Sequence, residues 1–117
     1  VSGVSGSCML INNKLLREIG YFDERYFAYQ EDSDFCLRAI NRGWKIYYHP
    51  DSIVVHYGGR GGAHSIPSRA TFEWHRSYIR YYTKHFSKDY SKAFNLLYYT
   101  IMIGKLIFAQ TILLILS

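Results

Sequence analysis

Three carboxylates lie within four positions of one segment, Glu31-Asp32-Ser33-Asp34, and form the densest group of residues that could do chemistry. The segment predicts the start of a helix over about Glu31 to Arg42, with Gly43 directly after its end. Acids in a first helical turn offset the helix dipole, and Asp34 can pair with Arg38 one turn later. Helix stability alone is therefore a sufficient explanation for the three acids.

Helical spacing separates Asp32 from Asp34. Asp32 shares the apolar stripe of the helix with Cys36 and therefore faces inward, whereas Asp34 shares another stripe with Arg38. A carboxylate at a helix start that faces a cleft with aromatic walls can accept a proton from a substrate hydroxyl. Asp32 is therefore the candidate general base, and Asp34 with Arg38 is the candidate structural ion pair.

A second group of candidates ends the β-favouring run Ile53-Val54-Val55. His56 follows this run, and the glycine-rich segment 58–62 contains Arg60. A histidine at a strand end can bind a metal ion, and a glycine-rich loop lets backbone amides and an arginine approach an anion. A lone histidine is also commonly a hydrogen-bonded structural residue, so both interpretations of His56 remain open.

Short apolar runs separated by turn residues position these groups, which is typical of mixed α/β structure over residues 1–66. A turn is expected at Pro50-Asp51. The expected strands are residues 8–11, 45–48 and 52–57. The expected helices are a short helix capped by Asn13 and ended by Gly20, and a helix over about residues 31–42.

The second half of the chain has a different character. Residues 67–92 mix aromatic and basic side chains and predict a basic helical segment, whereas residues 93–117 form an apolar helical tail with the single charge of Lys105. About 20 apolar residues can cross a bilayer, but a lysine near the middle of a span is costly. Three alternatives remain for the tail: a membrane-inserted or interfacial helix, a core helix, or two short helices.

The composition bounds the size and class of the protein. The chain has 117 residues, 49% of them hydrophobic, and a formal net charge of +5, which excludes intrinsic disorder and a two-domain enzyme. It contains no G-x-G-x-x-G or G-x-x-x-x-G-K-[ST] phosphate loop. Cys8 and Cys36 are expected to be reduced thiols. We therefore expect this chain to be part of a larger protein.

Several motifs in one order then resemble a known family. They are G-x-F-D-E at Gly20 to Glu24, E-D-x-D at residues 31–34 with Arg38, the pair Gly43 and Pro50, and His56 with glycines behind it. Over about residues 1–86 this series resembles the C-terminal half of the family 2 glycosyltransferases, particularly their bacterial rhamnosyltransferase-like members.

The resemblance implies an α/β fold: a partial GT-A fold that lacks its N-terminal nucleotide-binding half and is followed by C-terminal helices. Residues 1–66 would be the acceptor-side, catalytic half of the GT-A domain, residues 67–92 a basic helical segment, and residues 93–117 a tail that associates with a membrane. The family transfers a sugar from a nucleotide-diphosphate donor and inverts the anomeric configuration.

The resemblance also implies roles for individual residues. Asp32 would be the general base, and His56 would complete the coordination of Mg²⁺ or Mn²⁺ on the donor diphosphate. Arg60 would contact the donor diphosphate. Residues expected to bind or support the acceptor are Glu31, Asp34, Arg38 and Tyr29.

One departure from the family pattern limits these expectations. The D-x-D metal motif of the donor half is absent, and Asp32-Ser33-Asp34 belongs to the acceptor side instead. We therefore expect this chain to be inactive alone. The expected partners of the whole enzyme are a nucleotide-sugar donor and a lipid-linked saccharide or polysaccharide acceptor. We expect the enzyme to be bound to the cytoplasmic face of the cell membrane, either peripherally or by a C-terminal anchor.

A second hypothesis needs no chemistry. The basic segment and the apolar tail also fit a non-catalytic module that binds membranes or polyanions. Nucleic acid is not an expected partner, because no recognised binding motif accompanies the charge. Association into a homo-oligomer would be one way to cover the exposed sheet edge of a partial fold.

Overall fold

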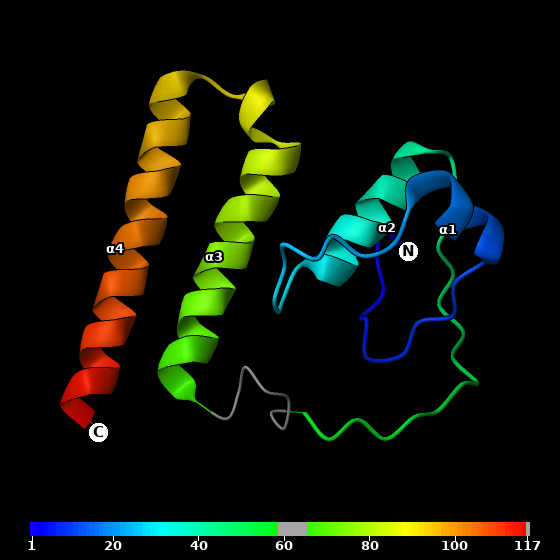
Figure 1. Ribbon diagram of the computed structural model, residues 1–117, viewed down its shortest axis with the longest axis horizontal. Coiled ribbons are helices and arrows are strands. Elements are labelled where there is room, and N and C mark those ends of the chain that lie inside the picture. Colours follow the sequence, from blue (N-terminus) through cyan, green and yellow to red (C-terminus); the bar gives the residue numbers. More distant parts are fainter. Residues whose placement is uncertain (59–65, 117) are drawn as a thin grey trace. The chain divides into compact units, whose positions relative to one another are not determined.

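The computed structural model describes residues 1–58 and 66–116 (Figure 1). The chain divides into two compact units, Val1–Tyr57 and Gly58–Ser117. The first unit contains α1 (Asn13–Ile19) and α2 (Glu31–Asn41). The second contains α3 (Pro67–His85), the short 3-10 helix η1 (Ser87–Asp89) and α4 (Lys92–Leu116).

Helix α1 ends at Gly20 as predicted, but its N-cap is Asn12, and Asn13, the predicted cap, is the first helical residue. The Asn12 side chain accepts a hydrogen bond from the Lys14 amide at 2.8 Å. Gly20 adopts a φ of 78° and donates its amide to the Leu16 carbonyl, which ends the helix.

Helix α2 packs against α1 and carries the core of the first unit. Its apolar stripe places Phe35 and Ala39 against Leu15, with Trp44 packed at the edge. The Trp44 indole also donates a hydrogen bond to Glu18 at 2.9 Å and so ties the end of α2 to α1. Helix α2 ends at the predicted place, where Gly43 adopts a φ of 83°.

The three predicted strands do not form in the described residues. Residues 8–11, 45–48 and 52–57 are extended but belong to no sheet, although the turn at Pro50-Asp51 is present. Leu10 and Ile53 expose 102% and 89% of their surface, so these apolar side chains have no packing partner. A strand is stabilised by a hydrogen-bonded neighbour, and the described residues supply none. The prediction of α/β structure is therefore not confirmed in this structure.

The second unit is a hairpin of two helices that lie side by side (Figure 1). Pro67 begins α3, where its missing amide proton is not needed. Aromatic contacts join the helices: the rings of Tyr82 and Tyr98 stack at 3.9 Å, and the Tyr82 hydroxyl donates a hydrogen bond to Asn95. Residues 93–116 form one continuous helix, which excludes the alternative of two short helices for the tail.

Candidate functional site

The N-terminus of α2 follows an unusual turn. Tyr29 and Gln30 adopt φ values of 66° and 65°, a left-handed conformation that residues other than glycine rarely adopt. Helix α2 begins directly after them, and the Asp34 amide donates to the Gln30 carbonyl at 2.8 Å. Such conformations cost on the order of 1–3 kcal/mol each and gather at functional sites. The turn therefore marks the start of α2 as a candidate site.

Asp32 is held at this helix start by backbone amides. Its Oδ2 accepts a hydrogen bond from the Gly6 amide at 2.9 Å, and its Oδ1 accepts one from the Ser33 amide at 2.7 Å. The side chain is only partly buried, whereas Asp34, which helical spacing assigned to another stripe, is the fully buried carboxylate of the helix start. Oδ1 also accepts a longer hydrogen bond from the Ser33 hydroxyl at 3.4 Å. Since each carboxylate oxygen can accept about two hydrogen bonds, Oδ2 is the oxygen of Asp32 that keeps a lone pair for a further donor.

Asp34 lies in a different environment. It is fully buried, and its Oδ2 accepts a hydrogen bond from Arg38 Nε at 2.8 Å, which confirms the predicted ion pair. The other two nitrogens of Arg38 donate to the carbonyls of Ile19 and Tyr21, each at 2.7 Å. Arg38 therefore joins α2 to the end of α1, and Asp34 fixes the direction of its guanidinium group.

Glu31 is the first residue of α2, and one of its carboxylate oxygens lacks a hydrogen-bond donor among the described residues. Its Oε2 is shielded from solvent and accepts no hydrogen bond from the residues that the structure describes. A buried polar atom in this state costs free energy unless a further donor reaches it. The helix start thus offers two carboxylates, Glu31 and Asp32, that can accept hydrogen bonds from a polyhydroxylated molecule.

The residues predicted for the donor side are not brought to this site. His56 is exposed in the extended segment that ends the first unit, and Arg60 lies outside the described residues. Within residues 1–58 and 66–116, no three histidine, cysteine or acidic side chains are placed to hold a metal ion. The described residues therefore do not form the donor set that Mg²⁺ or Mn²⁺ needs.

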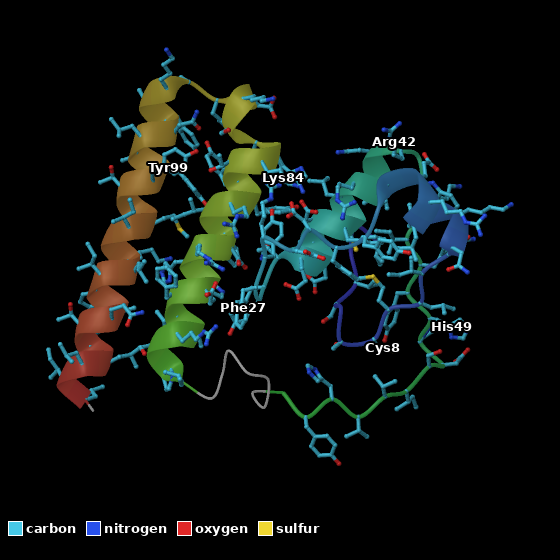
Figure 2. The ribbon with its side chains drawn as sticks, in the orientation of Figure 1. Cys8, Phe27, Arg42, His49, Lys84 and Tyr99 are labelled. Carbon is cyan, nitrogen blue, oxygen red and sulfur yellow. The ribbon has the colours of Figure 1, made fainter. Side chains whose placement is uncertain are left out.

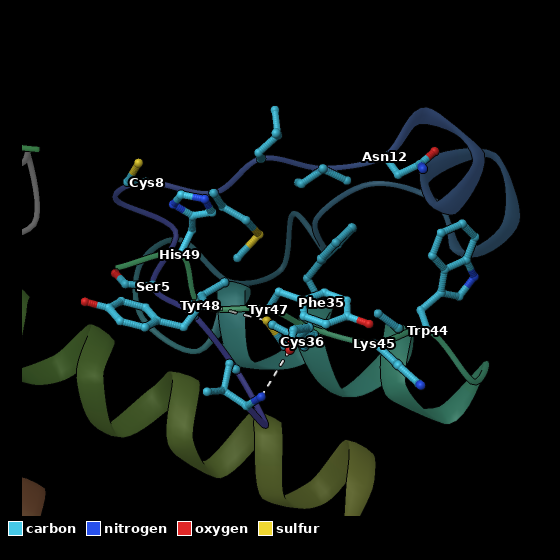
Figure 3. A pocket seen from close by; sticks show the side chains of 18 of the residues that line it. Ser5, Cys8, Asn12, Phe35, Cys36, Trp44, Lys45, Tyr47, Tyr48 and His49 are labelled. Carbon is cyan, nitrogen blue, oxygen red and sulfur yellow. Dashed lines mark hydrogen bonds between the residues drawn. The ribbon is translucent and has the colours of Figure 1, made fainter. Parts of the chain in front are cut away.

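A cavity of about 1290 Å³ opens elsewhere in the first unit, between the extended segments and α2 (Figure 3). Phe35, Cys36 and Trp44 line one side of it, and Tyr47 and Tyr48 belong to the extended segment that lines it as well. Asp32 is not among the lining residues. This cavity therefore belongs to the incompletely covered core of the unit, and the candidate chemistry lies outside it.

Two features of the site were missed by the sequence-based predictions. The bonds from Arg38 to the carbonyls of Ile19 and Tyr21 have no sequence signal, because every residue carries a carbonyl. The Asp23 carboxylate accepts hydrogen bonds from the Arg25 amide and guanidinium, the latter at 2.6 Å, and it raises the pKa of Arg25. That contact could have been predicted, since aspartate commonly accepts a hydrogen bond from the amide two residues later.

Comparison with known proteins supplies the family context. The family described as "Glycosyltransferase like family 2" matches residues 1–89. The chain is 42% identical over 57 residues to the N-acetylglucosaminyl-diphospho-decaprenol L-rhamnosyltransferase of Mycobacterium tuberculosis strain H37Rv, which covers 49% of this chain and 19% of that protein. No solved structure matches the chain.

Two further relatives are similar to shorter or longer parts of the chain. Rhamnosyltransferase WbbL of Escherichia coli K12 is 37% identical over 82 residues, 69% of this chain and 30% of that protein. The low-salt glycan biosynthesis hexosyltransferase Agl10 of Haloferax volcanii is 44% identical over 39 residues, 33% of this chain and 13% of that protein. The chain thus spans less than a third of the length of each of these relatives.

Proposed function

The chain belongs to the family 2-like glycosyltransferases, and from this membership we propose that it forms the acceptor-side part of an enzyme that transfers a hexosyl or rhamnosyl group. The donor in this proposal is a nucleotide-diphosphate sugar, and the acceptor is a saccharide hydroxyl. The single observation that carries the proposal is the amide-held carboxylate of Asp32 at the strained start of α2, within the matched residues.

Asp32 is the general base of the proposed reaction. The acceptor oxygen attacks the anomeric carbon of the donor sugar as the bond from that carbon to the diphosphate breaks, and the configuration inverts. The hydroxyl proton passes to the carboxylate of Asp32. The two amide hydrogen bonds hold this carboxylate in one orientation, which supports proton transfer without rearrangement of the side chain.

The neighbouring residues support the acceptor. Glu31, beside Asp32 at the first turn of α2, supports the acceptor pocket, and Tyr29 shapes the turn that precedes it. Asp34 and Arg38 hold the helix start against α1. In this proposal Arg60 contacts the donor diphosphate, and Mg²⁺ or Mn²⁺ is held mainly by residues of the remaining domain, with His56 as the ligand from this chain.

The remaining length of the enzyme supplies the donor half and completes the sheet of a GT-A fold. Residues 9–11 and 53–55 are apolar and lie outside any helix, which is compatible with strands of such a sheet. The name of the mycobacterial relative describes an acceptor attached to decaprenol. We accordingly propose a lipid-linked acceptor for this enzyme and a location at the cytoplasmic face of the membrane.

A second candidate function is supported by α4 alone. This helix is long and apolar enough to cross a membrane, and only 6% of its apolar window is buried. A non-catalytic membrane-binding module would need only such a helix. It would, however, give no reason for the strained turn or for the buried acceptor oxygen of Glu31, so sugar transfer is the better supported proposal.

Replacement of Asp32 tests the proposed function. Residues 1–89 of this chain would replace the corresponding region of the mycobacterial rhamnosyltransferase, and transfer of L-rhamnose to N-acetylglucosaminyl-diphospho-decaprenol would be measured. We expect Asp32→Asn to lower kcat by about 10²–10⁴-fold, the usual contribution of a general base, with the KM for the donor nearly unchanged.

Asp51→Asn is the matched control, because it makes the same change at an exposed position of the same unit. This variant should retain full transfer. Circular dichroism of both variants would show whether the chimeric domain is folded. Turnover of a folded Asp32→Asn protein at the unsubstituted rate would disprove the assignment of Asp32 as the base.

A further inference from the structure

Three polar side chains of helix α4 contact α3, two of them half-buried and one, Lys105, exposed. The Lys105 ammonium lies over the Trp74 ring, 5.8 Å from its centre, and the Gln110 amide donates to the Ser68 carbonyl at 2.6 Å. Tyr99 also lies on the side toward α3 (Figure 2), where its hydroxyl is 3.0 Å from that of Thr83. The lysine that weakens the case for a membrane helix therefore has a partner on α3.

The opposite face of α4 is apolar from end to end. Its two hydroxyl side chains are satisfied inside the helix, because Thr100 and Thr111 each donate to the carbonyl four residues earlier at 2.9 Å. The large exposed side chains of this face are Leu96, Leu97, Ile101, Ile103, Ile107, Phe108, Leu114 and Ile115. Phe94, Ile112 and Leu116 are also exposed and lie at the edge of this face, on the stripe of Lys105. A helix of a water-soluble surface shows the reverse pattern, with its polar side chains outward.

The outward face of α4 is therefore suited to lipid, but α3 restricts how the hairpin can enter a bilayer. Helix α3 runs beside α4 and carries charged residues along its length: Arg69, Glu73, Arg76, Arg80 and Lys84. Each arginine or lysine at the centre of a bilayer costs roughly 2.5–3.5 kcal/mol on insertion scales. If the hairpin crossed the membrane, α3 would place several of these charges in hydrocarbon.

Exposed cations lie at both ends of the hairpin. Lys88 and Lys92 are near the turn, and Arg69 is at the start of α3, beside the C-terminal part of α4 to which Gln110 ties it. In a crossing hairpin these two ends would meet opposite leaflets. In a hairpin that lies flat, both ends meet the same leaflet, where each basic residue contributes about 1 kcal/mol of attraction to anionic lipid.

We propose that the α3–α4 hairpin binds in the plane of an anionic lipid surface, with the outward face of α4 at the boundary between headgroups and acyl chains. Helix α3 then lies on the aqueous side, and the two cationic ends contact the headgroups of one leaflet. This inference rests on the membrane location in the proposed function but not on sugar transfer or on Asp32. It distinguishes a surface-bound hairpin from a membrane-spanning anchor.

Vesicle sedimentation with the full 117-residue chain tests the binding face. We expect binding to vesicles of phosphatidylcholine with phosphatidylglycerol, and at least about tenfold weaker binding to phosphatidylcholine alone or in high salt. The double variant Ile107→Glu/Phe108→Glu should lose binding by at least about tenfold, because two charges enter the buried face. Ile53→Glu is the matched control, since it adds a charge at an equally exposed apolar position of the first unit.

A depth measurement separates the in-plane arrangement from a span. Single cysteines at Leu97, Gly104 and Ile115, which share one stripe of α4, would carry a fluorescent probe in a Cys8→Ala/Cys36→Ala background. Gly104 has open space around it, so the substitution is accommodated. Lipids brominated at known depths should quench all three probes at the same shallow level.

Each other outcome overturns the proposal in a recognisable way. Deep quenching at Gly104 with shallow quenching at Leu97 and Ile115 would show a membrane span. Absence of vesicle binding, with self-association in analytical ultracentrifugation, would show that a second copy covers α4. The absence of binding would also remove the membrane location from the proposed function, while the transfer assay on Asp32 would still test catalysis independently.

Discussion

Asp32 and Asp34 are two positions apart in the sequence, but their different surroundings give them different roles. Asp32 is partly buried and held by two backbone amides, which leaves a lone pair of Oδ2 for an incoming hydroxyl. Asp34 has no exposed surface and is paired with Arg38. Of the two, only Asp32 can accept the proton of an acceptor without first breaking an internal ion pair.

The ion pair of Asp34 and Arg38 should therefore govern stability. We expect Asp34→Asn to destabilise the first unit by about 3–5 kcal/mol, because it leaves the Arg38 charge uncompensated in a mostly buried position. Urea denaturation followed by circular dichroism would measure the loss. Glu24→Gln, at an exposed position, is the control and should change the free energy of unfolding by less than about 0.5 kcal/mol.

A double substitution separates the ion pair from the other contacts of Arg38. Asp34→Asn/Arg38→Met removes both charges, and it should recover only part of the lost stability, because the carbonyls of Ile19 and Tyr21 also lose their donor. Complete recovery would show that these two carbonyl contacts contribute nothing measurable. An Asp34→Asn protein as stable as the original would contradict the structural role of the pair.

At the scale of elements, helix α2 begins with an unfavourable backbone conformation. Gln30 occupies the cap position in a left-handed conformation and makes no side-chain capping bond. Serine, threonine, aspartate or asparagine is preferred at that position. The turn nevertheless fixes where Glu31 and Asp32 lie relative to Tyr29, which is consistent with strain retained at a site of chemistry.

Relief of this strain should be measurable. Gln30→Asn is expected to raise the free energy of unfolding by roughly 0.5–1 kcal/mol, because asparagine tolerates a positive φ and can cap the helix. Gln30→Ala shortens the side chain without either benefit and should not stabilise the unit. Chemical denaturation would compare the two variants. Equal stability of the asparagine and alanine variants would show that the left-handed backbone at Gln30 stores no significant strain.

Across the whole molecule, features fixed by neighbouring residues were predicted well from the sequence. Gly20 ended α1 and Gly43 ended α2 as expected, whereas the N-cap of α1 is Asn12, one residue before the predicted Asn13. The left-handed pair Tyr29-Gln30 was missed, because the usual signal for a positive φ is glycine or asparagine. The ion pair of Asp34 and Arg38 was predicted because it depends only on helical spacing.

The predicted sheet did not form because it depends on residues far away in the chain. Val54 and Val55 favour a strand by type, but preference for a strand mainly expresses packing against neighbours. In the described residues these side chains are exposed, and the large apolar cavity beside the extended segments remains uncovered. The positions of the donor-side residues depend on the same missing neighbours, so the site could be predicted only where α2 alone builds it.

Residues 45–48 and 52–57 should become two strands when a longer polypeptide supplies neighbouring strands. In the part of the 117-residue chain that the structure describes, residues 45–48 and 52–56 belong to no sheet, so their backbone amides should exchange hydrogen with water almost without protection. In a longer polypeptide that supplies the neighbouring strands, the same amides should exchange at least about 100-fold more slowly, because exchange then requires their sheet hydrogen bonds to open. A 100-fold slowing corresponds to an opening free energy of about 2.8 kcal/mol. Hydrogen exchange with mass spectrometry would compare the two proteins, with α2 as the internal reference that is protected in both. Unprotected amides over residues 45–48 and 52–57 in the longer, folded polypeptide would show that these residues form loops and that the proposed α/β fold is wrong.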